Sequence, residues 1–388
     1  MLFTLEALDA AEGDSLLLLY GTAKRPRLII IDGGPRETCR AALLPRLLAL
    51  RDVFPGGGRA PLAVELAVVT HVDSDHIAGM VALTGQLRGS ADETDDPPIV
   101  IKELWHNSFD RALGERQVIE ALEFVNGLPA AELQTSGVVA SVAEGRRLAE
   151  DAAALDIAVN AEFADLVLRA DDGGVEVPCG DGLTLTVLGP AQAQLEAFRK
   201  EWQASLARAR GAVAATGGGD TSRPNLSSIV LLAESGGRRM LLPGDARADH
   251  ILAGLEAAGL LPPGGTMHVD LLKLPHHGSC RNNTAELLTR VTADTYVISA
   301  DGKHGNPDRE TLERLAEARA GARYTVACTF PAGADRLVRA DEPGADERRA
   351  ALHAFTEWAR RQRERGVTVQ HRDPGAPAVR IVLGDETL

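Results

Sequence analysis

Short apolar runs that end in polar or glycine-rich turns recur along the chain and predict β-strands. Residues 15–20 and 28–31 are two such runs, and the turn at 21–27 between them is typical of a hairpin. Residues 64–69 form a further run that leads directly into a cluster of histidines and aspartates. More strands are predicted at 99–105, 183–188, 228–233, 239–242, 269–274, 296–299 and 324–330, with a terminal hairpin that pairs 367–370 with 378–383.

Segments with apolar residues at helical spacing separate these runs. Helices are predicted at 37–53, 77–87, 191–212, 246–259, 284–289, 307–318 and 345–365. Strands that alternate with helices favour an α/β fold, here a layered αββα sandwich, over a helix bundle. We expect one domain over 1–388, in which 320–388 extends the core. Residues 110–175, rich in Ala, Leu and Glu, predict a helical insertion that is either a lid or an ordinary outer layer.

Composition narrows the classes of protein that fit. The 388 residues carry a net charge of −14, which argues against a surface that coats nucleic acid but leaves a local basic groove open. We expect no membrane contact, because there is no apolar run of 18 residues. The N-terminus predicts a strand rather than a signal peptide. Four cysteines without Cys-x-x-Cys spacing predict reduced thiols in a cytoplasmic protein, and three Trp with three Tyr give no base-stacking platform.

The segment from Thr70 to Gly79 carries the strongest chemical signal. It places two imidazoles and two carboxylates within six positions, directly after the apolar run 64–69. Such side chains suit zinc, manganese or iron, whereas a structural zinc site would use thiolates. The spacing His-x-Asp-x-Asp-His therefore predicts ligands for two adjacent divalent metal ions that activate water for hydrolysis. The predicted ligands here are His71, Asp73, Asp75 and His76.

Two later strand ends offer further ligands. Asp245 follows the apolar run 239–242, and its two carboxylate oxygens could bridge two cations; capping the next helix is the alternative role. His276 and His277 follow the run 271–274, and adjacent side chains point in different directions. We favour His276 as the metal ligand and His277 as the group that assists the leaving group or a substrate oxyanion.

Together these motifs resemble the metallo-β-lactamase superfamily. More narrowly, they resemble the hydrolase domain of ComEC-type DNA-uptake proteins and its free-standing soluble relatives. The resemblance covers about residues 1–110 and 180–320, and it also includes the segments 11–15, 31–34 and 225–230. It implies hydrolysis, with nuclease or phosphodiesterase activity in the competence branch. It also implies that Asp32 orients a metal-binding histidine from behind.

Two positions depart from the pattern that the resemblance implies. Asn225 stands where many superfamily members have a third histidine for the first metal, although the ComEC-like subgroup shares this Asn. An amide oxygen binds a borderline metal more weakly than imidazole does. Asn306 stands where relatives have a histidine before a proline, and His304 is the nearest substitute for it. Ser279 closes the His-His-Gly-Ser motif as a further second-shell or substrate residue.

The leading hypothesis is a binuclear hydrolase of phosphodiesters in which Asp75 and His277 are the catalytic residues. The metal ligands in this hypothesis are His71 and Asp73 for one cation, Asp75, His76 and one of His276 and His277 for the other, and Asp245 as the bridge.

Two alternatives remain. One keeps the metals but hydrolyses an ester, lactone, amide or phospholipid, and the other is a non-catalytic binding module, which Asn306 motivates. Nucleic acid and proteins of the same operon are the partners that the resemblance leaves open.

Overall fold

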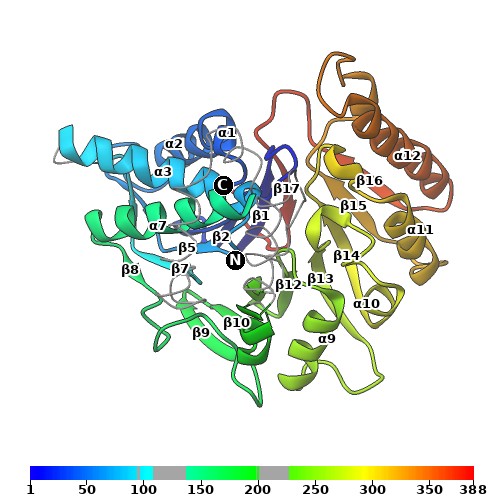
Figure 1. Ribbon diagram of the computed structural model, residues 1–388, viewed down its shortest axis with the longest axis horizontal. Helices are drawn as coiled ribbons and strands as arrows, with labels where there is room; N and C mark the ends of the chain where they lie inside the picture. The colour runs from blue at the N-terminus through cyan, green and yellow to red at the C-terminus, as the bar shows by residue number, and fades with distance from the viewer. Residues whose placement is uncertain (94–96, 108–136, 198, 201–226) are drawn as a thin grey trace, which may run out of the picture.

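Two β-sheets lie face to face, and helices cover the outer side of each (Figure 1). The computed structural model describes residues 1–93, 97–107, 137–197, 199–200 and 227–388. The first sheet comes mostly from the N-terminal half of the chain and the second from the C-terminal half. The predicted α/β sandwich is confirmed.

The first sheet has the strand order β17-β1-β2-β3-β5-β7-β8. Strands β1, β2 and β3 form an antiparallel meander, whereas β3, β5 and β7 are parallel. Its strands are β1 (Leu2–Leu8), β2 (Leu16–Thr22), β3 (Arg25–Ile31), β5 (Leu66–Val69), β7 (Glu103–His106), β8 (Ala158–Val159) and β17 (Ala378–Val382).

The second sheet has the strand order β16-β15-β14-β13-β12-β11-β10-β9. Its strands from β12 to β16 are parallel, so their carboxyl ends lie at one edge of the sheet. The strands are β9 (Val175–Gly180), β10 (Leu183–Gly189), β11 (Val230–Ser235), β12 (Arg238–Leu242), β13 (Met267–Lys273), β14 (Val291–Ile298), β15 (Thr325–Cys328) and β16 (Thr368–His371). A separate pair joins β4 (Leu62–Val64) to β6 (Ile99–Ile101).

The helices divide between the two outer faces (Figure 1). On the first sheet they are α1 (Arg36–Thr38), η1 (Cys39–Leu43, a π-helix), α2 (Leu44–Val53), α3 (Ser74–Glu93) and α7 (Gly137–Ala154). On the second sheet they are α9 (Ala248–Ala257), α10 (Ala285–Arg290), α11 (Arg309–Ala318) and α12 (Ala345–Glu364). Short 3-10 turns are η3 (His276–Gly278), η4 (Lys303–Gly305) and η5 (Ala334–Arg336). None of the described helices is long and apolar enough to cross a bilayer.

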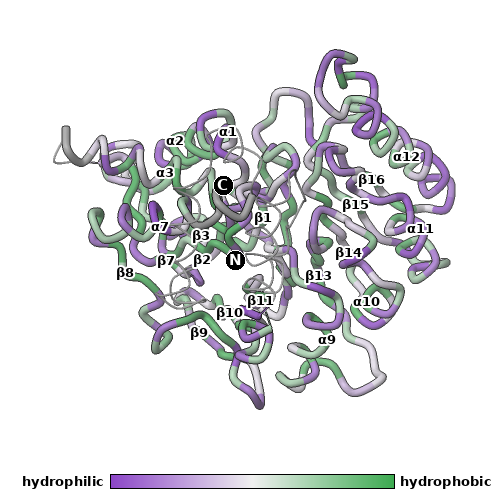
Figure 2. The backbone as a smooth tube through the Cα atoms, viewed as in Figure 1, coloured by the Kyte–Doolittle hydropathy of each residue, from purple (hydrophilic) through white to green (hydrophobic). Residues whose placement is uncertain are grey.

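Strand β2 shows why its sequence is an unbroken apolar run. Leu16, Leu18 and Tyr20 join the core between the two sheets, whereas Leu17 and Leu19 join the core beneath the helices. Successive side chains of a strand point to opposite faces, so a strand buried on both faces needs apolar residues throughout. In Figure 2 the strands β2 and β3 of the first sheet are largely green, whereas the outer helices α11 and α12 carry much purple.

The predicted terminal hairpin is wrong. Strand β16 extends the second sheet beside β15, and β17 crosses to the first sheet and pairs antiparallel with β1. Val379 and Ile381 of β17 pack into the core between the sheets, so this strand covers an edge of β1 that would otherwise be open. The predicted strand at 99–105 is also two strands, β6 and β7, which belong to different sheets.

The predicted insertion at 110–175 is described only in part. Residues 108–136 lie outside the described residues, as do 201–212 of the predicted helix at 191–212. From residue 137 the insertion contains α7, which packs against α3, and then the short strand β8. Helix α7 is therefore a neighbour of the helix that begins in the histidine and aspartate loop.

Candidate metal centre

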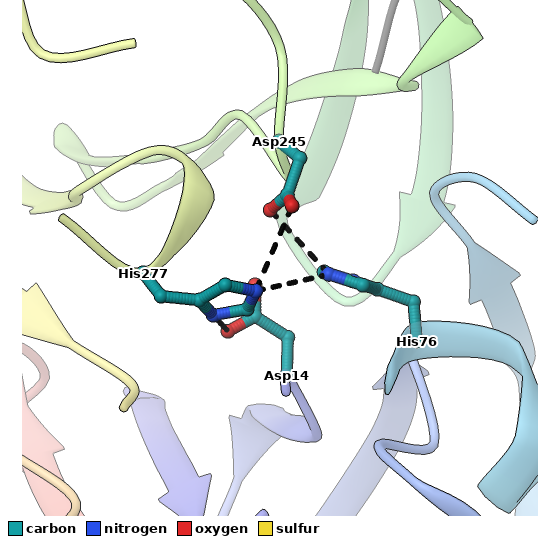
Figure 3. Close-up of side chains that lie close together, drawn as sticks. All are labelled: Asp14, His76, Asp245 and His277. Atoms are coloured by element: carbon teal, nitrogen blue, oxygen red, sulfur yellow. Dashed lines mark hydrogen bonds and ion pairs between the residues drawn. The ribbon is translucent and has the colours of Figure 1, made fainter. Parts of the chain in front are cut away.

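The polar residues predicted as ligands follow the carboxyl ends of strands in both sheets. His71 follows β5 in the first sheet, whereas Asp245 follows β12 and His277 follows β13 in the second. Figure 3 shows His76, His277 and Asp245 converging on one point from separate elements, with Asp14 from the loop after β1 beside them. The face-to-face sheets therefore bring residues more than 200 positions apart into one cluster.

The loop after β5 turns sharply into helix α3. The backbone carbonyl of Asp73 accepts hydrogen bonds from the amides of His76 and Ile77, both at 2.9 Å, so Asp75 and His76 lie in the first helical turn. Gly33 and Gly79 allow this turn to press against the end of β3. A Cβ added at Gly79 would lie 1.9 Å from the carbonyl oxygen of Gly33, so any larger residue there would push the ligand loop away.

We call Asp75, His76 and His277 the second ligand set, because both imidazoles lie near Asp245 and Asp75 lies near both imidazoles. His76 Nε2 lies 3.4 Å from Asp245 Oδ1, and His277 Nε2 lies 3.6 Å from Asp245 Oδ2. The two imidazole Nε2 atoms are 3.3 Å apart, and His277 Nε2 is also 3.3 Å from Asp75 Oδ2. Asp75 Oδ2 also lies 3.9 Å from His76 Nε2, so the three side chains of the set converge.

We call His71, Asp73 and His276 the first ligand set, because its two imidazoles lie near Asp245 and Asp73 lies near His71. His71 Nε2 lies 3.8 Å and His276 Nε2 lies 3.7 Å from Asp245 Oδ2. Asp73 Oδ2 is 3.5 Å from His71 Nε2. Asp245 is therefore the one carboxylate that both sets share, which is the position that a bridging ligand requires.

All four imidazoles use Nδ1 for a bond to the protein and turn Nε2 toward Asp245. A metal-binding histidine has this arrangement, because a partner on the other ring nitrogen fixes the tautomer and the orientation of the ring. The Nδ1 partners are Thr70 Oγ1 for His71 at 3.1 Å, Asp32 Oδ2 for His76 at 2.8 Å, Asn282 Oδ1 for His276 at 2.9 Å and the Ser299 carbonyl for His277 at 3.0 Å.

Asp32 orients one histidine of each ligand set, His76 directly and His71 through Thr70. Asp32 Oδ2 accepts a hydrogen bond from His76 Nδ1. The same oxygen accepts a second hydrogen bond, from the hydroxyl of Thr70 at 2.7 Å. Because that hydroxyl donates to Asp32, its oxygen is left to accept Nδ1–H of His71. Asp32 Oδ1 also accepts the Thr70 backbone amide at 2.7 Å, which holds the carboxylate still. Asp32 thus lies where the sequence resemblance implied an orienting residue.

Asp14 contacts the second set on the side of His277 that faces away from Asp245. Its Oδ1 is 3.4 Å from His277 Nδ1, the ring nitrogen that faces away from Asp245, and its other oxygen pairs with the buried ammonium of Lys273. Asp14, His76, Asp245 and His277 form a buried group that could hold a metal ion. Because Lys273 already neutralises Asp14, we interpret Asp14 as a support for the His277 ring rather than a direct ligand.

The paired histidines lie on an unusual turn. His276 and His277 have φ angles of 51° and 54°, in the left-handed region that costs a residue with a Cβ about 1–2 kcal/mol. This turn separates the two rings, whose planes stand at 77°, so that one joins each ligand set. His277 lies among the buried group, which differs from the sequence-based preference for His276 as the ligand nearer the metals.

Charge dominates the electrostatics of the second set. Burial alone would lower the pKa of His277, but the carboxylates of Asp245 and Asp14 outweigh it and raise the pKa to about 10. His76 shows the same balance, and Asp245, Asp32 and Asp75 raise its pKa well above the usual value. The positive imidazoles in turn hold the pKa of Asp245 well below its usual value despite burial. The cluster therefore attracts positive charge, whether protons or cations.

The residues fit a pair of divalent cations. His71 Nε2 and Asp245 Oδ1 are buried and have no hydrogen-bond partner among the described residues, a costly state that a bound ion would relieve. Donors about 2.1 Å from a tetrahedral metal lie about 3.4 Å from one another, close to the spacing of the second set. Asp73, Asp75 and His276 have side chains 24%, 30% and 31% exposed, so the centre has an open side.

The remaining predicted residues take other positions. Asn225 lies outside the described residues. The amide of Ser279 donates to the His276 carbonyl at 2.8 Å, so Ser279 closes the histidine turn. Asn306 is buried next to Pro307, and Pro307 packs against Gly278 of that turn. His304 is exposed, and no contact joins it to the cluster among the described residues.

Sequence reasoning assigned no role to Thr70, Lys273, Asn282 or Asp14. Lys273 gave a signal, since a lysine within the apolar run 271–274 must find a counter-charge if it is buried. Glu144 of α7 was missed as well. Its Oε2 accepts the hydroxyl of Ser74 at 2.7 Å, and burial raises its pKa while the charge of Arg36 opposes that rise.

No family model and no curated protein sequence matches the chain. Similar solved structures include zinc-bound PqqB from Methylobacterium extorquens, with a TM-score of 0.38 and 13% identity over 97% of this chain and 99% of that one. CmlA, a diiron β-hydroxylase from Streptomyces venezuelae, has a TM-score of 0.38 and 13% identity over 98% of this chain. This chain covers 54% of CmlA, about half its length.

A metallo-β-lactamase from Hirschia baltica has a TM-score of 0.25 and 14% identity over 63% of this chain and 73% of that one. At this level of similarity, neither the activity nor the metal of these proteins can be assigned to this chain. The order of the strands in the two sheets and the ligand motifs at their carboxyl ends are features of this chain itself. Together they describe an αββα sandwich whose candidate ligands follow the carboxyl ends of strands.

Proposed function

We propose that this protein is a metal-dependent hydrolase that cleaves phosphodiester bonds at a two-cation centre bridged by Asp245. The observation that carries the proposal is the common orientation of four imidazoles, each anchored through Nδ1 and aimed through Nε2 at one shared carboxylate. Packing alone would not require four buried or half-buried histidines to adopt the same orientation.

The ligand assignment follows from the two sets. His71, Asp73 and His276 would hold one cation, and Asp75, His76 and His277 would hold the other. Bound there, two divalent cations would supply Lewis acidity and lower the pKa of water toward neutrality. His276 would complete the first set, whose third ligand position the resemblance gave to Asn225, a residue outside the described ones.

The chain's own residues prepare the site for this chemistry. Asp32 and Thr70 hold the imidazoles of His76 and His71 in the orientation that binding needs. Asp75 and Asp73 lie at the open side, where a substrate would enter. In this arrangement His277 is a metal ligand. No other imidazole among the described residues is assigned the role of assisting the leaving group, which the sequence suggested for His277.

The choice of a phosphodiester rests on two considerations. The motifs resemble the ComEC-type hydrolases, and a pair of adjacent cations can stabilise both the attacking and the leaving oxygen of a phosphoryl transfer. The mixed donors, two imidazoles with carboxylates around each position, suit zinc and manganese alike. Esters and lactones are the competing substrates.

The test is hydrolysis of labelled single-stranded DNA, duplex DNA, RNA and bis-p-nitrophenyl phosphate by zinc- or manganese-loaded protein. Asp75→Ala is the matched variant, because it removes one ligand of the second set at the open side. We expect cleavage of at least one phosphodiester by the wild type and none above background by the variant. Cleavage of esters or lactones alone by protein with both metals bound would contradict the choice of substrate.

A further inference from the structure

A cavity of about 700 Å³ lies on the outer side of the first sheet, apart from the ligand cluster. Helix α3 contributes its apolar lining through Val81, Ala82 and Gly85. Arg36 and Arg40 come from α1 and η1, and Arg147 comes from α7. The volume falls within the range of small-molecule sites, and its lining combines an apolar surface with positively charged groups.

The positive charge around this cavity contrasts with the negative net charge of the chain. The whole protein carries a net charge of −14, yet three arginines outnumber Glu37, the carboxylate among the lining residues. Among the described residues Arg36 and Arg40 form no direct ion pair, although the charge of Arg36 acts on the carboxylate of Glu144. Arg147 pairs through Nε with Asp151 at 3.1 Å and remains half exposed. Guanidinium groups around an apolar surface are suited to bind an organic anion, above all a phosphate ester.

The cavity is close to the candidate metal centre. Helix α3 carries His76 in its first turn and the lining residues Val81 and Gly85 farther along, about 8 to 14 Å away at 1.5 Å per residue. Helix α7 contributes Arg147 to the cavity, and one turn earlier Glu144 bonds Ser74 of the ligand loop. The same two helices therefore join the cavity to the open side of the centre.

We propose that Arg36, Arg40 and Arg147 bind backbone phosphates of a polynucleotide strand whose scissile phosphodiester lies at the metal centre. This inference rests on the proposed function and names its substrate class as an oligonucleotide rather than a small phosphodiester. The apolar surface of α3 would lie against the bases, and the guanidinium groups would contact the phosphates.

Binding is measured without turnover, with EDTA present, by the fluorescence anisotropy of a fluorescein-labelled ten-nucleotide oligodeoxythymidine. The variant is Arg36→Ala/Arg40→Ala, which changes no candidate metal ligand. We expect its affinity to fall about tenfold or more, because two charge-assisted contacts are lost. The slope of log affinity against log salt should fall by about 1.4, since each phosphate contact on a single strand contributes about 0.7.

The control variant is Arg59→Ala/Arg323→Ala, which removes the same charge from two exposed arginines that line no part of the cavity. We expect it to bind the oligonucleotide within twofold of the wild type. Equal affinity of both double variants for the oligonucleotide would overturn the proposal. A loss of inorganic phosphate binding with unchanged oligonucleotide binding would also overturn it, because the cavity would then be a site for a free anion.

Catalysis provides the second readout. The variant Arg36→Ala/Arg40→Ala should raise KM for the ten-nucleotide substrate about tenfold and leave hydrolysis of bis-p-nitrophenyl phosphate within twofold. An equal loss on both substrates would contradict a distal phosphate site. If the wild type hydrolyses no phosphodiester but the binding difference persists, the proposed function fails while the anion site stands.

Discussion

The two ligand sets on either side of Asp245 differ in what stands behind their histidines. In the second set, His76 is backed directly by the carboxylate of Asp32, and His277 by a backbone carbonyl with Asp14 close by. In the first set, the partners are neutral, the hydroxyl of Thr70 and the amide of Asn282. A carboxylate partner makes an imidazole more basic and so a stronger ligand. We infer that the second set holds its cation more tightly than the first.

The largest effect should come from Asp245→Ala, which removes the carboxylate that both sets share. We expect loss of both bound metals and a fall in kcat of more than about 100-fold, beyond the 10–100-fold that is typical of an outer partner. Metal content by mass spectrometry beside steady-state rates measures this. The alternative role noted from the sequence, capping the next helix, is not seen, because the N-cap of α9 is Arg247. Two metals retained with near-normal turnover would therefore show that Asp245 is not a bridging ligand.

The two adjacent histidines, His276 and His277, test the difference between the two ligand sets directly, because each belongs to a different set. His277→Ala should lose the tightly bound cation and most activity, whereas His276→Ala should keep that cation and lose only the weaker one. The dissociation constants of both cations from calorimetric titration check this difference. If His276→Ala instead lost the tighter cation, the order of the two sets would be reversed.

A smaller effect is expected from the residues behind the histidines. Asp32→Asn should weaken metal binding about 10–100-fold at both positions, because Asp32 orients His76 directly and His71 through Thr70. Thr70→Val is its matched partner, since it keeps the shape of the side chain and removes the hydroxyl that joins Asp32 to His71. It should weaken the first position alone, and an equal effect on both would argue against the relay through Thr70.

The smallest predicted effect is on stability against pH. The pKa of His277 in the metal-free fold is about 10, above the value near 6.5 of an unfolded chain. Its stabilisation is therefore complete below about pH 6.5 and is lost as the pH rises toward 10. We expect the metal-free protein to unfold more easily in urea at pH 9.5 than at pH 7, and His277→Gln to reduce that difference. A metal-free wild type that is equally stable at both pH values would contradict the protonated state of the cluster.

The sequence predicted the layers of the fold and the loop His71–His76 because both depend on local patterns. Apolar runs showed where the strands lie, and closely spaced ligands can be recognised without knowledge of the fold. The same approach failed for β16 and β17, whose short separation suggested a hairpin although they pair in different sheets. Pairing partners are set by which sheet edge is open, and a local pattern does not contain that information.

The residues that hold the histidines in place could not be predicted from the sequence either. Asp14 and Lys273 are 259 positions apart in the printed sequence, and no spacing rule joins them. The roles of His276 and His277 depend on two left-handed backbone conformations, which are common for glycine but rare for histidine. Long-range packing and backbone geometry therefore determined what the motifs left open.

The most direct measurement is a titration of the metal-free protein with manganese or zinc, in which bis-p-nitrophenyl phosphate hydrolysis is followed at each step. The two-cation account predicts no activity at the start, a tight first binding event with little turnover, and full activity as two equivalents per chain become bound. Full activity at one equivalent would contradict the role of the first ligand set. Two equivalents bound without hydrolysis would contradict phosphodiester cleavage itself.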